Sequence, residues 1–501
     1  MLPKPETASL KVGSPRPLTK NDFLAGVQCH KQLWWRVHDP FAMELVPDEC
    51  ARALIKTGRE VGISAREHVP GGQLISFRHQ ATSARISATH AAMANGDEVV
   101  YDATFSSDGL VIRVDILERA GDGWTLISVK SSLDVKEKHI TDAAVQAHVL
   151  RRSGIDLRRI EIMHLNRDCR HPDLSNLFVR ESITAKVTEL STDFRAEAEA
   201  QLLMLRGTLP EKTTGEHCST PGRCPFWDRC WAQRPDYHVS TMYRSGQKAR
   251  EWEQKGWQTI ADLPESIVLN PVARRQMSAV RAGRIQVEST LSSALEAFAG
   301  PLAFLDFETV APAIPRWNGC APFTAVPVQL SCHLEDADGG WRHVEWLAEG
   351  PGDPRPELAR FLVENCGDGR SIVAYNSAFE ADCIRGLAEA VPGLATELRD
   401  MEHRLIDLLT LVREHVYHPS FAGSFSLKQV LPALVPGKQY HGMRIAKGST
   451  ASYQLLALLF GDVMDAQERS IIREELLAYC KQDTWAMVQL LRQIRELAHS
   501  S

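Results

Sequence analysis

The chain lacks any apolar run long enough to serve as a membrane span or a secretion signal. No segment of its 501 residues approaches the roughly 20 consecutive apolar residues that cross a bilayer. The first twenty residues are polar and proline-rich, without the apolar core of a signal peptide. We therefore expect a cytoplasmic protein with no membrane partner. Its 11 cysteines, an odd number, should then be metal ligands, buried apolar residues or functional thiols rather than disulfides.

An excess of positive charge is also missing. The formal net charge is −6 at pH 7 and the isoelectric point is near 6.3, so the chain as a whole does not carry the basic signature of a nucleic-acid-binding protein. A nuclease that holds divalent metal ions needs clustered carboxylates, however, and a local basic channel can still follow the phosphates. The net charge therefore neither supports nor excludes a protein that acts on nucleic acid.

Internal repeats and low-complexity tracts are absent as well. With 44% hydrophobic and 24% charged residues, the composition is that of an ordinary globular protein and excludes a disordered or fibrous one. A chain this long is too large for one hydrophobic core, because domains usually hold about 100–200 residues. We expect an α/β protein, and changes of pattern divide it into three regions, 1–235, 236–298 and 299–501.

Local patterns assign elements to these regions. In the first, an extended N-terminus precedes a helix over 49–67, β-like stretches over 98–117 and 124–129, and a helix over 142–152. The second is expected to be a helical linker, with helices in MYRSGQKAREWEQKGW and ARRQMSAVRAGR around the turn DLPES. The third opens on an apolar strand, PLAFLDFETV, and ends on an amphipathic helix, EELLAYCKQDTWAMVQLLRQIREL.

Two acidic residues interrupt that apolar strand. Residues i and i+2 of a strand point to the same face, so Asp306 and Glu308 in LAFLDFE project side by side. Two neighbouring charges on a buried strand need a counter-charge. A pair of divalent cations roughly 4 Å apart would supply it and would clamp the attacking and leaving oxygens of a phosphodiester. The alternative is a strand that simply emerges into solvent at this pair.

Further acidic and phenolic residues follow at separations that fit one compact domain. The apolar segment SIVAYNSAFE predicts a second strand that ends at Asn376 and places Glu380 just beyond it. In YCKQD, Tyr479 and Asp483 are four residues apart and lie on one face of a helix. A phenol in that position can orient a water molecule beside a metal-bound carboxylate.

These three segments resemble motifs I, II and III of the DnaQ-like DEDD exonucleases of the tyrosine subclass, which have an RNase H-like fold. The resemblance implies a 3′ to 5′ exonuclease domain over residues 299–501. It also implies four acidic ligands for two Mg²⁺ or Mn²⁺ ions, namely Asp306, Glu308, Glu380 and Asp483. By the same resemblance, Tyr479 positions the attacking water.

The second motif departs from the family pattern, in which this position is usually Asp. Here Glu380 occupies the place, with Asp382 two residues on, and the longer side chain shifts the geometry. Asp407 in RLIDLLTLV is another candidate near the site, or else a residue that ends a strand or begins a helix. The wider segment, from LDFETVAPAIPRWNGCAPFTAVPVQLSCH through FSLKQVLPAL to YCKQDT, resembles an uncharacterised bacterial domain family found behind RecB-type nuclease domains.

Cys218, Cys224 and Cys230 form a regular C-x5-C-x5-C array near the end of the first region. The short spacings of zinc modules are absent, whereas cubane iron–sulfur clusters accept varied spacing and need four thiolates. The segments LTKNDFLAGVQCHKQLWW and CPFWDRCW resemble RecB-type nucleases of the iron–sulfur class, including the CRISPR adaptation exonucleases, which tie one early cysteine to three late ones. The resemblance implies a [4Fe-4S] cluster with Cys29 as the fourth ligand. Cys50 and Cys169 are alternatives for that ligand, and zinc is an alternative for the cluster.

The same resemblance implies a PD-(D/E)xK nuclease core, of restriction-endonuclease-like fold, between these cysteines. Such a core carries an acid on one strand, an acid and a lysine two residues apart on the next, and a glutamine on the following helix. The matching positions are Asp115 in VIRVDIL, Lys130 in LISVKSS and Gln146 in DAAVQAHVL. Asp115 and the second acid would share a metal ion, while Lys130 would stabilise the developing charge.

The second acid of this core is missing. Its position is Ser128, and a hydroxyl supplies no negative charge to hold Mg²⁺. A neighbouring acid could compensate, and the candidates are Glu60, Asp102 and Glu118. Otherwise the domain binds or guides nucleic acid without cutting it, and Lys130 and Gln146 lie on a solvated strand end and a polar helix face.

The middle region interleaves lysines and arginines with Trp252 and Trp257, which suits contacts to phosphates and stacked bases or, equally, a solvated helical linker. The phrase KGWQTIADLP resembles a helix-hairpin-helix element. We therefore predict a DNA-processing nuclease that removes nucleotides from single-stranded 3′ ends. The alternatives are a nucleic-acid-binding or redox-responsive module without catalysis, and an exonuclease that acts on RNA.

Overall fold

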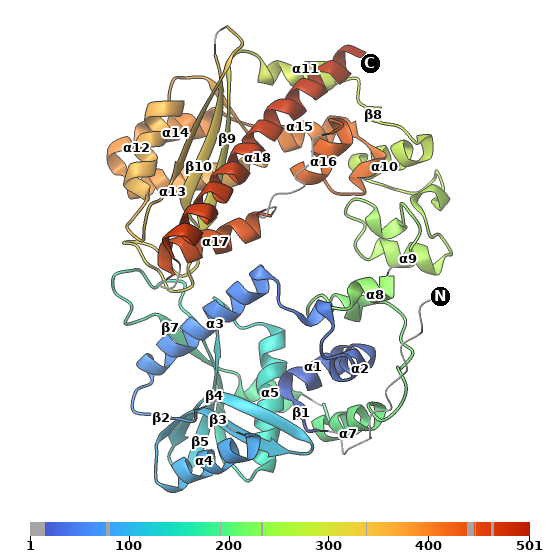
Figure 1. Ribbon diagram of the computed structural model, residues 1–501. Helices are drawn as coiled ribbons and strands as arrows, with labels where there is room; N and C mark the ends of the chain where they lie inside the picture. The colour runs from blue at the N-terminus through green and yellow to red at the C-terminus, as the bar shows by residue number, and fades with distance from the viewer. Residues whose placement is uncertain are drawn as a thin grey trace. The chain divides into compact units, whose positions relative to one another are not determined.

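The computed structural model in Figure 1 describes residues 16–76, 81–190, 192–231, 234–336, 338–437, 445, 447–461 and 465–500. Residues 1–15, where an extended N-terminus is expected, lie outside these ranges. Contacts divide the chain into two units, the first made of Met1–Gln233 and Ala313–Phe323 and the second of Arg234–Pro312 and Thr324–Ser501. Each unit contains a large sheet with parallel and antiparallel strands, so the expected α/β class is confirmed.

The first unit is built on a seven-stranded sheet in the order β2-β3-β4-β5-β6-β7, with β1 paired to β4. The expected β-like stretch 98–117 is the antiparallel pair β3 and β4, and 124–129 lies within β5. Strands β5 and β6 are parallel, so a crossover must join them. The strands are β1 Leu18–Thr19, β2 Gln73–Leu74, β3 Val99–Ser107, β4 Leu110–Ala120, β5 Gly123–Lys130, β6 Leu157–Leu165 and β7 Phe178–Ser182.

Helix α5, Glu137–Arg152, makes that crossover and includes the helix expected over 142–152. Its buried Ala143, Ala144 and Ala147 are small, which lets the helix axis lie close to the sheet. Helix α3, Glu49–His68, matches the helix expected over 49–67. The other helices of this unit are α1 Lys20–Gln28, α2 His30–His38, α4 Thr82–Ala94, α6 Thr184–Glu189, α7 Phe194–Met204 and α8 Trp227–Trp231.

The second unit has a five-stranded sheet in the order β11-β10-β9-β12-β13. Strand β9 is central: β10 pairs with it antiparallel on one side and β12 pairs parallel on the other. The strands are β9 Leu302–Val310, β10 Val326–Glu335, β11 Trp341–Leu347, β12 Ser371–Ala374 and β13 Leu405–Asp407, and a separate antiparallel pair joins β8 Gln286–Val287 to β14 Val416–Tyr417. The helices after β9 are α12 Arg355–Cys366, α13 Ser377–Ala390, α14 Ala395–His403, α15 Leu408–His415, α16 Leu427–Leu434, α17 Gly448–Phe460 and α18 Ala466–Ser500.

The two faces of β9 belong to two different hydrophobic cores. Ala303, Leu305 and Phe307 pack in the cluster formed with α12, α13 and α14. Leu302 and Phe304 pack in the cluster that includes α15, α16 and α18. Figure 1 shows the long helix α18 running along β9 and β10, away from α12, α13 and α14. Because side chains alternate along a strand, the residues after Phe304 on the α18 face are 306 and 308.

Helix α18 is 35 residues long and contains the amphipathic helix expected near the C-terminus. Its buried positions recur every three or four residues, as a helix with one packed face requires; they include Leu476, Tyr479, Cys480, Asp483, Met487, Leu490 and Ile494. None of the helices in the described ranges combines the length and the apolar content needed to cross a bilayer.

The middle region is less helical than expected. In MYRSGQKAREWEQKGW, α9 covers only Lys248–Gln254, because Arg244 and Gly246 before it adopt positive φ of 54° and 50° and Gly256 after it a φ of 86°. Helix α10, Pro271–Ala282, and the short α11, Leu291–Ala294, follow. The expected linker 236–298 is grouped with the second unit, where Arg275 donates a hydrogen bond of 2.9 Å to the carbonyl of Arg413.

Candidate active site

Three carboxylates converge where β9 faces α18. One oxygen from each of Asp306, Glu308 and Asp483 lies within 4.8 Å of the others. Strand alternation places the first two on the α18 face, and the helical period places Asp483 on the buried face of α18. Asp306 is partly buried, whereas Glu308 and Asp483 are buried, with 8% and 9% of their surface exposed. The fold therefore brings together three acidic residues that come from two segments far apart in the sequence.

Burial and mutual repulsion strongly oppose ionisation in this cluster. Burial, followed by the charge of Asp483, raises the pKa of Asp306 to about 8. Burial and the neighbouring Asp306 and Asp483 hold the pKa of Glu308 well above its usual range. Acidic groups kept in such a place require either protons or a cation, and oxygen donors of this kind suit Mg²⁺ and Mn²⁺.

Glu380 lies in the first turn of α13, just after β12 and the left-handed Asn376, whose φ is 75°. Only 2% of its surface is exposed, and its Oε2 atom makes no hydrogen bond to any residue that the structure describes. Burial, then the charge of Asp306, raises its pKa to about 9. Glu380 is not one of the three residues whose oxygens lie within 4.8 Å of one another, but it is an electrostatic neighbour of Asp306.

The two alternative acids have other partners. The side chain of Asp382 is 71% exposed and forms an ion pair of 2.8 Å with Arg385. Asp407 is the N-cap of α15: it accepts hydrogen bonds from the backbone of Leu409 at 3.0 Å and from the hydroxyl of Thr410 at 2.6 Å. Asp407 therefore begins a helix, and its charge also helps to raise the pKa of Glu380, so it lies near the acidic cluster as well.

Tyr479 is buried beside the carboxylates, and a lysine that the sequence motifs did not indicate reaches it. Lys428, on α16, donates a hydrogen bond of 2.6 Å to the Tyr479 hydroxyl and lies 4.4 Å from the centre of its ring. Burial, followed by the charge of Asp483, raises the pKa of Tyr479, so the phenol stays protonated. The positive charge of Lys428 lowers the pKa values of Asp306 and Glu308, and so partly opposes the effect of their burial.

A polar network behind the carboxylates ties α18 to β10. The Thr484 hydroxyl lies 2.8 Å from Nδ1 of His333 and 2.9 Å from the hydroxyl of Ser331, which in turn lies 2.9 Å from Nε2 of His343. Ser331 is the register partner of Asp306 on the neighbouring strand. The network therefore fixes the residue next to Asp483 relative to the strand pair that carries Asp306.

In the first unit, the expected PD-(D/E)xK residues are also brought together. Asp115 Oδ2 accepts hydrogen bonds from the backbone N–H of Val129 at 2.9 Å and from the hydroxyl of Ser128 at 3.4 Å. The Gln146 amide lies 3.5 Å from the same hydroxyl. Ser128 thus sits between Asp115 and Gln146 and joins them without adding charge.

Asp142 on α5 holds Lys130, the lysine of this core. The sequence motifs did not single Asp142 out. Lys130 forms an ion pair of 2.6 Å with Asp142, and Lys20 forms another of 2.7 Å. Gln146 also donates to Asp142, at 3.1 Å. Asp142 and Gln146 share a face of α5 because they are one helical turn apart, but no local pattern shows that two lysines meet there.

Among the compensating acids, Asp102 lines the same pocket as Asp115 and is paired with Arg66 at 2.7 Å. Glu118 is paired with Arg180 at 2.5 Å, and Glu60 lies on α3.

The four expected cysteines line one small pocket. Cys29 lies between α1 and α2, Cys218 ends the 3-10 turn Glu216–Cys218, Cys224 precedes α8 and Cys230 lies within α8. Gln28 fixes this arrangement by donating hydrogen bonds of 2.7 Å to the carbonyls of His217 and Gly222. Burial raises the pKa of Cys224 to about 11, and the other three cysteines add to the rise. Cys169 is buried in another cluster.

The spacing of these thiols bears on the metal they would hold. A tetrahedral zinc ion with bonds of about 2.3 Å to sulfur places its sulfurs about 4 Å apart. In the described part of the chain, no three cysteine sulfurs lie within 4.8 Å of one another. The cysteine sulfurs as placed are therefore spread more widely than a tetrahedral zinc ion would hold them.

The two tryptophans of the middle region pack its core, whereas most of its basic residues are exposed. Trp252 is buried in a core with Met277 and Ile260, and Trp257 packs against the same core. Arg275 is buried and pairs with Glu288 at 2.6 Å. Both tryptophans thus belong to the core, whereas five of the basic residues are exposed, namely Arg244, Lys248, Arg274, Arg281 and Arg284.

Comparison with known proteins gives a partial match. A family model described as a domain of unknown function (DUF2779) matches residues 303–426, which include Asp306, Glu308 and Glu380. An "Uncharacterized protein MG366 homolog" of Mycoplasma pneumoniae (strain ATCC 29342 / M129 / Subtype 1) is 24% identical over 211 residues, covering 37% of this chain and 31% of that protein. The chain thus spans about a third of the length of this relative. No solved structure matches. Neither description names a nuclease, so the two nuclease resemblances stay predictions.

Proposed function

We propose that this protein is a metal-dependent nuclease whose second unit removes nucleotides from the 3′ end of a single DNA strand. The observation that carries the proposal is the convergence of Asp306, Glu308 and Asp483 within 4.8 Å, from a strand and a helix far apart in the sequence. The order of the five strands, with β9 central, supports an RNase H-like fold for this unit. For the first unit, we propose the PD-(D/E)xK fold on the positions of Asp115, Lys130 and Gln146.

The carboxylates have the chemistry that a pair of Mg²⁺ or Mn²⁺ ions requires. Asp306, Glu308 and Asp483 would hold one ion between them, and the unpartnered oxygen of Glu380 would contribute to a second. Bound divalent ions would stabilise negative charge on the attacking and leaving oxygens of the phosphodiester. Hydrolysis adds one water across the terminal P–O3′ bond: its oxygen goes to phosphorus and its proton to the departing 3′ oxygen.

The residues of the chain position this reaction. The protonated Tyr479 hydroxyl is held by Lys428 at 2.6 Å and can orient the attacking water. Lys428 adds a positive charge beside the carboxylates, where negative charge develops on the phosphate. The network through Thr484 keeps α18 in register with β10, and so maintains the distance between Asp483 and Asp306.

For the first unit we propose binding and guiding of the strand rather than cleavage. Asp142 is paired with Lys130, and Ser128 offers no charge beside Asp115, so this core has one acid fewer than a metal-dependent site needs. We also propose a [4Fe-4S] cluster on Cys29, Cys218, Cys224 and Cys230, which would close α1 and α2 onto the segment that ends this unit.

The test is degradation of matched single-stranded DNA and RNA by the purified full-length chain in Mn²⁺ or Mg²⁺. With a 5′ label, we expect progressive shortening of DNA from the 3′ end. The double variant Asp306→Asn with Asp483→Asn should abolish it, since each substitution keeps the shape and removes a charge. Asp382→Asn, an exposed acid on α13, is the matched control and should retain full activity.

Other outcomes separate the alternatives. Faster shortening of RNA than of DNA would assign the activity to RNA. Absence of hydrolysis on both substrates, together with equal Mn²⁺ affinity of wild type and double variant, would overturn the nuclease proposal in favour of a binding or redox-responsive module.

A further inference from the structure

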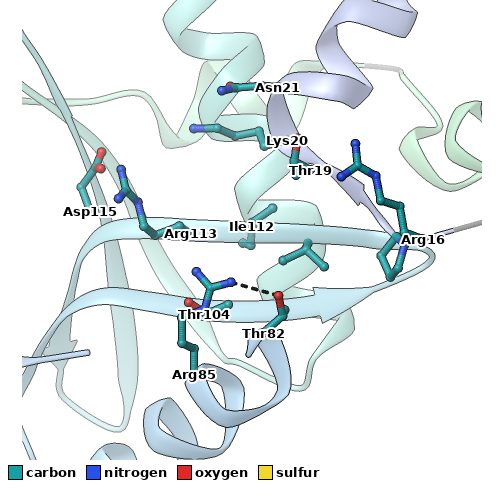
Figure 2. A pocket seen from close by; sticks show the side chains of 12 residues that line it. Arg16, Thr19, Lys20, Asn21, Thr82, Arg85, Thr104, Ile112, Arg113 and Asp115 are labelled. Atoms are coloured by element: carbon teal, nitrogen blue, oxygen red, sulfur yellow. Dashed lines mark hydrogen bonds between the residues drawn. The ribbon is translucent and has the colours of Figure 1, made fainter. Parts of the chain in front are cut away.

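The first unit contains a pocket of about 610 Å³ that the proposed reaction does not use. Three separate segments line it: the residues leading into α1, the first turns of α4, and strands β3 and β4. Figure 2 shows Lys20, Arg85 and Arg113 extending from three different elements around this hollow. Arg16 stands at its edge, so four cationic side chains line the pocket against one carboxylate, Asp115.

Three acids next to the pocket are each shared between two cations. Asp22 lies near both Arg16 and Arg36, at 3.9 and 3.4 Å. Asp142 pairs with Lys20 and Lys130, at 2.7 and 2.6 Å. Asp102 pairs with Arg66 at 2.7 Å and lies 3.7 Å from Arg113. One carboxylate neutralises one cation, so a positive charge is left over beside Asp22 and beside Asp142, whereas Asp115 balances the second arginine beside Asp102.

The pocket also has neutral surfaces of two kinds. Pro17, Val111 and Ile112 form an aliphatic wall, and the hydroxyls of Thr19 and Thr82 stand among the cations. Arg85 is oriented by its hydrogen bond of 2.9 Å to Thr82, the contact drawn in Figure 2. Cations and hydroxyls suit a phosphate, and the aliphatic wall suits a sugar or base. Pockets for small ligands measure about 300–1,000 Å³, a range that includes this one.

A second hollow, of about 640 Å³, continues from the first. The two share Arg113 and Asp115 on β4, and the second adds Arg59 and Arg66 from α3. Cationic side chains therefore follow both hollows and meet at Arg113. Successive phosphates of a strand need such a series of cations.

We propose that the pocket lined by Arg16, Lys20, Arg85 and Arg113 binds one phosphorylated nucleotide of a single nucleic-acid strand, and that the strand continues into the hollow beside Arg66. This inference deepens the proposed function, since it supposes that the chain acts on nucleic acid. It names the place where the first unit holds the strand, and it needs no hydrolysis at either acidic site.

The test measures binding of 3′-fluorescein-labelled dT10 to the full-length chain by fluorescence anisotropy, in EDTA so that nothing is hydrolysed. The double variant Arg85→Gln with Arg113→Gln should raise Kd about 10-fold or more. The slope of log Kd against log salt concentration should fall by about 0.7 per cation removed. Arg195→Gln, an exposed arginine on α7 paired with Glu199, is the matched control and should change Kd less than about twofold.

Further experiments identify the ligand and distinguish strand binding by the first unit from hydrolysis by the second. The Arg85→Lys, Arg113→Lys variant keeps both charges and should restore the salt slope, which a merely misfolded pocket would not do. Displacement of the probe by dTMP but not thymidine would show that a free nucleotide suffices; displacement by unlabelled dT10 alone would require a strand. Because binding is measured in EDTA, an absence of hydrolysis in the nuclease assay leaves this inference intact. Equal Kd values for the Gln double variant and wild type would overturn it.

Discussion

The buried carboxyl of Glu380 allows the second acidic ligand to be tested through protein stability. Its pKa is raised from 4.5 to about 9, so the folded chain binds this proton more tightly than the unfolded chain does. For this group, the free energy of unfolding is therefore greatest below about pH 4.5 and falls as the pH rises towards 9. Glu380→Gln removes the titration and keeps the shape of the side chain.

The size of the effect follows from the raised pKa. At pH 8 the unfolded chain gains its ionisation while the folded chain remains protonated, and the difference between pH 8 and 4.5 corresponds to ~5 kcal/mol. Relaxation around the site reduces this to about 2–5 kcal/mol. A unit of this size gains about 2–4 °C for each kcal/mol, so the metal-free variant should melt about 4–20 °C above wild type at pH 8. At pH 5 the difference should nearly vanish.

The assay is thermal unfolding by scanning fluorimetry at pH 5 and pH 8, in EDTA and in excess Mn²⁺. Mn²⁺ should stabilise wild type by ~3 kcal/mol at a hundredfold excess over Kd, and stabilise the variant less, because one charged ligand is gone. Glu389→Gln, an exposed acid on the same helix, should show neither effect. The reasoning fails if Glu380→Gln melts at or below wild type in EDTA at pH 8, or if Mn²⁺ stabilises both proteins equally.

Two further predictions concern residues outside the acidic cluster. Lys428→Met should lower kcat about 10-fold to 100-fold with little change in KM or melting temperature, because the substitution displaces Tyr479 rather than a metal ligand. Lys428→Arg should restore part of kcat. An unchanged kcat in the Met variant would show that Lys428 has no role in the site. Cys224→Ser should lose bound iron and visible absorbance and should lower the melting temperature of the first unit. Cys50→Ser should keep the iron, the absorbance and the melting temperature of wild type. Zinc instead of iron in a metal analysis of wild type would contradict the cluster.

The sequence could predict which residues share a face of one helix or one strand, because that depends only on the repeat of the element. Asp306 and Glu308 share a face because a strand repeats every two residues, and Tyr479 and Asp483 share one because a helix repeats about every 3.6. Which face is buried depends on partners distant in sequence. Both faces of β9 lie in hydrophobic cores, so the alternation along the strand could not tell which partners Asp306 and Glu308 would meet.

Lys428 and Asp142 could not be predicted in this way. A single lysine on an amphipathic helix has the same local pattern whether it meets solvent or a buried phenol, and only the packing of α16 against α18 decides between them. Asp142 likewise reads as a polar residue near a helix start until two lysines from other elements reach it.

Two segments differ from the sequence-based expectation. One is shorter as a helix because of its backbone conformation, and the other belongs to the first unit because of its long-range contacts. The left-handed Arg244 and Gly246 break a stretch whose composition favours helix. Residues Ala313–Phe323, between β9 and β10 in sequence, belong to the first unit, where the backbone N–H of His171 donates to the carbonyl of Cys320 at 3.0 Å and Gly319 donates back at 2.9 Å.

The hydrogen bonds from Gln28 to the carbonyls of His217 and Gly222 have a consequence for synthesis of the chain. The first of them joins residues 189 positions apart, the same separation as Cys29 from Cys218. At about 5–20 residues per second, a ribosome needs about 10–40 s to make the intervening chain. During that time Cys29 emerges without the three thiols that later surround it. A cluster on these four residues can therefore be assembled only after nearly half of the protein has been translated, and oxidants in the cell reach Cys29 before any of its partners.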